Sequence, residues 1–314
     1  MIDFNLIITI RYLPMMYFTG LSMELKPDRF FTTVSSALTL LLIAFLTPAT
    51  TLADELPQKF EANYTLEMYG ITLAEATHKL EHTDKGLSMS VNTQPVGLLA
   101  FLYDGHVDIR SEVAKDNGQL LLVNHDYSLI EDNGDSDDSE DSNDDQEPDT
   151  NTVRYNIDWV NNQNKRPAGN VTGIYKGETI NINSDQPVWD PLSIQALIII
   201  NADKEAESQR HGLLMKGELK HYILENLGKE EISLNSTTMT ALKTFIKEAD
   251  RDRVIYVWML PEYHNIPVKY EHWKNGKLKT TILLQSVTFE DDGKTDTLTI
   301  THSSEEDDNE FEDW

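Results

Sequence analysis

The chain has 314 residues, a formal net charge of −27 and no cysteine. An acidic surplus of this size argues against nucleic-acid binding, because neutralising phosphates requires a basic surface. Without cysteine there is no disulfide framework and no route to a lipid anchor attached through a cysteine. The folded part must therefore be held together by burial of apolar side chains.

Residues 23–53 carry the pattern of a secretory signal peptide. Two basic side chains follow Met23, an apolar run covers residues 34–46, and small residues then end at Ala53. A basic start, a short apolar core and a small-residue cleavage site are typical of an export signal. The core is shorter than the ~20 residues that a membrane span needs. We expect cleavage near Ala53, a mature protein that begins near Asp54 in the periplasm or the medium, and no stable transmembrane anchor in that form.

Two acidic segments account for most of the charge. Residues 131–150 contain 11 acidic side chains and residues 303–314 contain 7, with no lysine or arginine in either segment. Removing these 18 residues from the net charge of −27 leaves −9 for the rest. Both segments have too few apolar residues to offset the entropy of ordering, so we expect a disordered insertion and a disordered tail. A calcium loop in the insertion is an alternative, although Gly134 precedes the acidic run instead of lying within it.

The sequence predicts that the whole chain is divided into three parts. Residues 1–53 form an N-terminal extension and the signal, with translation starting at Met1 or Met23. Residues 54–302 form a single β-rich domain that carries the insertion, and the acidic tail follows. The insertion falls between two expected strands, where loop closure costs little more for a long loop than for a short one.

The dominant period of this domain is two. Apolar residues at 60, 62, 64, 66 and 68 alternate with polar ones, which places them on one face of a strand. Similar segments recur along the chain, separated by turn residues, and Asn275-Gly276 is the strongest hairpin signal. We expect about eleven to thirteen antiparallel strands on this pattern.

Helical signals are few. Residues 192–201 predict a helix that is apolar on nearly all sides and therefore buried, with Asp190 as its cap and Pro191 at its first position. Residues 238–249 fit either a second helix or a strand pair. Residues 95–102 fit either a buried short helix or a flap over the mouth of a cavity. The expected fold is mainly β: an antiparallel, strongly curved sheet or incomplete barrel that wraps one buried helix around residues 192–201.

Three groups of residues resemble one known family. They are Phe60-Glu61-Ala62-Asn63-Tyr64 followed by Gly70, Asp190-Pro191-Leu192-Ser193, and Val257-Trp258-Met259 with Pro267-Val268-Lys269. Over roughly residues 58 to 290 the chain resembles exported bacterial proteins catalogued as domain of unknown function 3108. The resemblance implies a secreted or periplasmic β-rich domain, similar to envelope proteins that carry lipid or lipoprotein, and it implies no catalytic residue.

Candidate binding residues are the aromatic side chains that a curved sheet could direct into an apolar cavity, together with two apolar residues of segment 95–102. They are Trp189, Tyr256, Trp258, Tyr270, Trp273, Leu98 and Phe101.

No metal, cofactor or catalytic motif emerges from the sequence. His78 and His82 are four residues apart, but on a strand that spacing separates them by ~13 Å, too far for one metal ion. Asp190 and Ser193 are explained by helix capping. The leading hypothesis is a non-enzymatic exported protein of binding or envelope-maintenance function, with an apolar or lipid-like ligand. The alternatives are an interaction module that pairs with another envelope protein and, with less support, a hydrolase.

Overall fold

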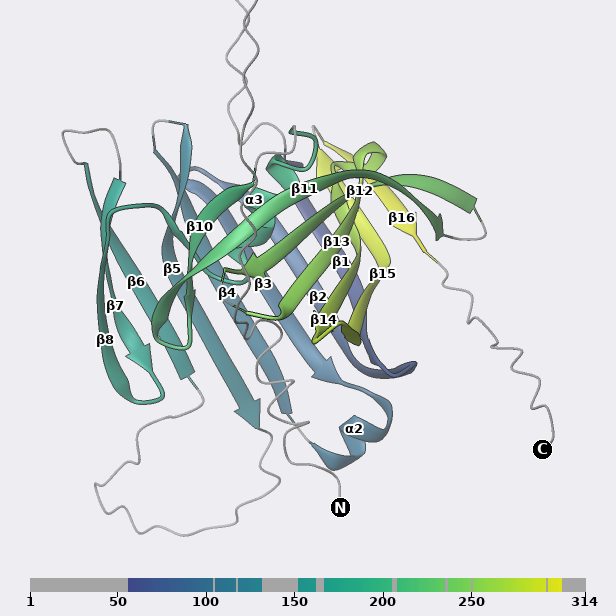
Figure 1. The fold of residues 1–314 in the computed structure, drawn as a ribbon, viewed down its shortest axis with the longest axis horizontal. Helices are drawn as coiled ribbons and strands as arrows, with labels where there is room; N and C mark the ends of the chain where they lie inside the picture. The colour runs from purple at the N-terminus through teal and green to yellow at the C-terminus, as the bar shows by residue number, and fades with distance from the viewer. Residues whose placement is uncertain are drawn as a thin grey trace, which may run out of the picture.

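The computed structural model describes residues 56–300 except 104, 117, 132–151, 162–166, 205–207, 235–236, 250 and 292. These residues form one sheet of 16 strands and two short α-helices (Figure 1). The first half of the sheet contains β1 (Lys59–Met68), β2 (Ile71–Thr83), β3 (Gly86–Pro95), β4 (Gly105–Asp116), β5 (Gln119–Glu131), β6 (Thr152–Asn161), β7 (Pro167–Tyr175) and β8 (Glu178–Ser184). The second half contains β9 (Val188–Trp189), β10 (Gln209–Met215), β11 (Glu218–Leu234), β12 (Thr237–Glu248), β13 (Arg253–Leu260), β14 (Ile266–Lys274), β15 (Lys277–Asp291) and β16 (Lys294–Thr299).

The two halves join where β1 pairs with β15. The strand order runs β8-β7-β6-β5-β4-β3-β2-β1-β15-β14-β13-β12-β11-β10-β9, and β16 pairs with β15 beside this path. All described pairs are antiparallel except β9 with β10. In Figure 1 the two halves face each other with α3 (Ser193–Ile200) between them.

Side-chain contacts draw the two ends of the sheet together. The backbone N–H of Gly217, in the β10–β11 turn, donates a hydrogen bond of 2.8 Å to the hydroxyl of Tyr155 on β6. Gly217 also packs against Ile180 of β8, with space for little more than a hydrogen atom. The sheet is thus a nearly closed barrel around one helix, which confirms the expected fold class.

Strand β1 shows how the sequence places the core. Phe60, Ala62, Tyr64 and Leu66 are buried, while the residues between them are at least partly exposed. Burial of this alternating set fixes the register, since a slip by one residue would turn every apolar side chain outward. The β14–β15 hairpin turns at Asn275 and Gly276, both with positive φ, as the sequence predicts.

The 16 strands exceed the eleven to thirteen expected from the sequence. Strand β10 and the two-residue strand β9 were not expected. Residues 238–249, for which a strand pair was one alternative, lie mostly in the single strand β12. The helical alternative for residues 238–249 is wrong: β12 pairs with both β11 and β13. Strand β11 contains a bulge, where its register with β12 shifts between Asn226 and Gly228.

The helices differ in burial. Helix α3 confirms the buried helix, with Ile194, Ala196 and Ile198 among its buried residues. Helix α2 (Gly97–Leu102) is short as expected, but only Leu99 is buried, so a buried helix in this segment is wrong. None of the helices in the described ranges is long and apolar enough to span a membrane. The expectations for the signal, the acidic insertion and the tail fall on residues outside those ranges.

Candidate functional site

A cavity of about 140 Å³ lies between α3 and the sheet. It is lined from three sides: by Ala76, Val91 and Thr93 in the first half of the sheet, by Ile246, Ile255 and Ile282 in the second, and by α3. Several lining residues, such as Thr93 and Ile109, keep partial exposure. The cavity is therefore accessible from solvent, and most of its lining side chains are apolar.

Four polar side chains, Tyr64, His78, Gln195 and Tyr270, form a polar wall of this cavity and make hydrogen bonds to one another or to the backbone. Tyr270 donates a hydrogen bond of 3.2 Å to Oε1 of Gln195, and Tyr64 donates one of 2.9 Å to the carbonyl of Pro267. The His78 ring lies 4.7 Å from the Tyr64 ring and hydrogen-bonds Gln195. This wall offers weak polarity without a formal charge.

Burial controls the charge state of the wall. It lowers the pKa of His78 from 6.5 to about 4, and the hydrogen bond to Gln195 opposes this only partly. Burial also raises the pKa values of Tyr64 and Tyr270. All three side chains are therefore neutral at pH 7, as the apolar surroundings require.

The lowered pKa of His78 predicts a pH-dependent stability. The unfolded chain takes up this proton near pH 6.5 and the folded chain near pH 4, so the unfolded state binds more protons between these values. Stability due to His78 is complete above pH 6.5 and falls by at most about 3 kcal/mol as the pH drops to 4. Denaturant unfolding of the wild type and of His78→Gln across this range measures it. Parallel pH profiles would contradict the assignment; His272, whose pKa is also lowered, is common to both proteins.

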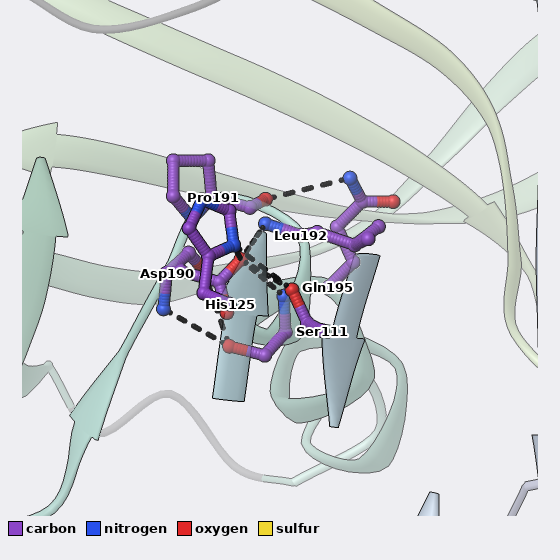
Figure 2. Close-up of polar contacts among 7 residues, drawn as sticks. Ser111, His125, Asp190, Pro191, Leu192 and Gln195 are labelled. Carbon is purple, nitrogen blue, oxygen red and sulfur yellow. Dashed lines mark hydrogen bonds and ion pairs between the residues drawn. The ribbon is translucent and has the colours of Figure 1, made fainter. Parts of the chain in front are cut away.

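A second polar cluster anchors the start of α3 to the sheet (Figure 2). Ser111 of β4 donates a hydrogen bond of 2.9 Å to Oδ1 of Asp190, and Nδ1 of His125 on β5 lies 3.3 Å from the same oxygen. The backbone N–H groups of Leu192 and Ser193 also donate to it, at 2.7 and 3.2 Å. In return, the Ser193 hydroxyl accepts the Asp190 N–H. Asp190 thus makes capping contacts with the backbone, as predicted, but the helix begins at Ser193 with Leu192 as its N-cap residue, so the predicted helix start with Pro191 at the first position is wrong.

The charge of Asp190 is held by these contacts. Burial acts to raise the pKa of this carboxyl, but the His125 imidazole and the hydrogen bonds from Ser193 and Leu192 together outweigh burial and lower it. His125 in turn stacks on Tyr155. Asp190 therefore remains a carboxylate although it is fully buried.

Serine, histidine and aspartate invite comparison with a nucleophile relay, but the geometry differs. In such a relay the histidine contacts the nucleophile through one ring nitrogen and the acid through the other. Here Nδ1 of His125 faces both partners, and the Ser111 hydroxyl donates to Asp190 instead of to the histidine. Ser111 is also fully buried. In this geometry the cluster attaches the start of α3 to strands β4 and β5.

A model of one protein family, described as "Protein of unknown function (DUF3108)", matches residues 59–282. The chain belongs to this family. That match confirms the resemblance drawn from the sequence motifs. No curated protein and no solved structure matches the chain.

The DUF3108 domain places the sequence-predicted candidates in different locations. Tyr270 lines the cavity. Trp189 is buried in the core, and Trp258 is buried beneath Lys243 and Lys269, whose ammonium nitrogens lie 4.5 and 4.8 Å from its ring centre. A groove lined by Tyr256 and Trp273 lies on the opposite face of the sheet. Leu98 and Phe101 are exposed on α2.

Tyr64, His78 and Gln195 were not named as cavity residues from the sequence, but their positions within their strands and helix could have indicated this role. Tyr64 and His78 stand at inward positions of β1 and β2, and Gln195 is one of two polar residues, with Ser193, in an otherwise apolar helix. Inward-facing polar side chains need a buried partner. Among the described residues, no group of three or more His, Cys, Asp or Glu side chains is placed to hold a metal ion.

Proposed function

We propose that this DUF3108 protein is exported and that it binds an apolar or amphipathic ligand in the cavity between α3 and the sheet, without catalysing a reaction. The observation that carries the proposal is the apolar cavity of about 140 Å³ with one weakly polar wall. The export pattern at residues 23–53 supports the location.

The size of the cavity limits what enters it. An engineered protein cavity of about 150 Å³ takes up benzene or xenon. The space beside α3 thus suits a ring or a short length of acyl chain, with the rest of a larger ligand remaining outside. An amphipathic molecule that inserts one apolar end fits this description.

The lining also limits the charge of the inserted part. Of the described residues that line the cavity, none is Asp, Glu, Lys or Arg. A charged group placed there would lose its hydration without gaining an ion pair. The inserted part is therefore uncharged, and a hydroxyl or carbonyl near Gln195 or His78 is the most polar group the wall can accept.

The direct test is mass spectrometry of an organic extract from natively purified protein. We expect an amphipathic compound in an amount of up to one molecule per protein chain. An extract of protein that was unfolded and washed before extraction should lack it. A clean extract, together with no uptake of a fluorescent fatty-acid probe by the native protein, would contradict the proposal.

One observation favours the alternative of an interaction module. Strand β8 lies at the end of the sheet order and pairs with β7 on one side, so its other edge offers backbone groups for an added strand. A partner protein that co-purifies stoichiometrically with ligand-free protein, and that is lost when Asn181→Pro blocks this edge, would support this function over ligand binding.

A further inference from the structure

Exposed apolar side chains concentrate at one edge of the barrel. Nine large apolar side chains are exposed among the described residues, and five belong to the β1–β2 turn region and to α2. We call these five the apolar rim: Tyr69, Ile71, Leu98, Phe101 and Leu102. Phe101 is 87% exposed and Tyr69 78%. Single exposed apolar residues are common, but a group of this kind marks a contact surface.

The two segments of the rim form one structural unit. The backbone N–H of Val96 donates a hydrogen bond of 2.9 Å to the carbonyl of Leu73, which ties the start of α2 to β2. Leu99 is buried and anchors the helix, while Leu98 and Phe101 point to solvent. The rim is therefore held in place by the fold and not by its own apolar contacts.

The rim lies beside the cavity. Tyr64, Ala76, Thr93 and Val107 face one another across β1 to β4 and line the cavity. Leu66, which also lines the cavity, lies three residues before Tyr69, or ~10 Å along the chain, and α2 begins four residues after Thr93, or ~13 Å. Figure 1 shows α2 at the lower end of the sheet. A molecule leaving an apolar phase at the rim would have a short path to the cavity.

The charge pattern indicates the partner. Residues 68–74 and 95–103 contain no charged residue, and the acidic Glu67 and Glu75 flank the first segment. A surface with acidic flanks is repelled by anionic lipid. A stable protein interface uses some 20–30 residues a side and about ten hydrogen bonds, which a projecting group of five apolar side chains does not provide. An apolar group with aromatic members suits shallow insertion at a lipid surface.

We propose that the apolar rim inserts into a zwitterionic lipid surface and delivers the apolar end of a lipid to the cavity. This inference rests on the proposed ligand-binding function and specifies where the ligand is collected. It assigns different roles to two sets of residues: the rim contacts the membrane, and the cavity holds the ligand.

Flotation with phosphatidylcholine vesicles tests the rim. We expect wild-type protein to float with the vesicles. Leu98→Ser and Phe101→Ser each remove a large inserted side chain, so each should lower the partition coefficient between vesicles and solution. The double variant should lower it at least about tenfold. Leu227→Ser is the matched control, because Leu227 is exposed but lies on β11, and it should float like the wild type.

The same preparations separate this inference from the proposed function. Ligand in the organic extract with no flotation of the wild type would overturn the rim as a membrane contact while leaving ligand binding intact. Flotation of the double variant at the wild-type level would overturn it too. A stoichiometric protein partner that is lost in the rim variants, with no vesicle binding, would assign the rim to a protein interface instead.

Discussion

Replacing Asp190 by alanine is expected to lower the free energy of unfolding by about 3–5 kcal/mol, because several buried hydrogen-bond donors lose their common acceptor and each unsatisfied donor costs about 1–3 kcal/mol. The fully buried carboxylate holds Ser111, His125 and two backbone N–H groups at the start of α3. Without it, these groups stay buried and lose their acceptor. Chemical denaturation at pH 7 measures the change.

Asp126→Ala is the matched control. Asp126 lies next to His125 on β5, but its carboxylate pairs with the exposed Arg154 at 2.6 Å, and such a surface pair contributes about 0–1 kcal/mol. If Asp190→Ala does not fold, Ser111→Ala removes a single donor and should cost about 1–2 kcal/mol. A loss below 1 kcal/mol for Asp190→Ala would show that the cluster is not the anchor of α3.

Replacing Ala76 by leucine is expected to reduce ligand binding at least about tenfold, since displacing one buried apolar group from the site costs more than 1.4 kcal/mol. Ala76 lines the cavity and is paired with Tyr64 on β1 and with Thr93 on β3. The added carbons enter space that the ligand would fill, so stability is expected to stay constant or to rise by about 0.5–2 kcal/mol. Titration with a fluorescent fatty-acid probe, together with thermal unfolding, measures both effects.

Ala62→Leu provides the contrast on the adjacent strand. Ala62 is fully buried in the core but does not line the cavity. Added carbons there have no space and should cost about 1–3 kcal/mol through overpacking. If Ala76→Leu lost stability to the same extent as Ala62→Leu, the space beside Ala76 would not be a usable cavity.

Most of the fold could be predicted from local sequence patterns. The alternation in β1 and the Asn275-Gly276 turn depend on neighbouring residues, and both were readable from the sequence. Helix α3 was readable because a run of isoleucines cannot face water. Residues 238–249 were ambiguous because threonine and apolar residues in β12 fit either period, and only pairing with β11 and β13 decides between them.

The site depended on contacts between distant segments, which no local pattern encodes. Ser111 and Asp190 are 79 positions apart, and Tyr64 contacts Pro267 across 203 positions. Aromatic content pointed to Tyr270 as a cavity residue, but it pointed equally to Trp258 and Trp273. These residues differ in the face of the sheet to which their side chains point. Which face that is depends on a register that shifts between β13 and β14 and again between β14 and β15.

The most direct test of the central claim is a crystal structure of the protein purified under native conditions. We predict non-protein electron density between α3 and the sheet, in contact with Tyr64, His78 and Gln195, and its loss in Ala76→Leu. A cavity closed by repacked side chains, with no density after soaking with a fatty acid, would contradict the account.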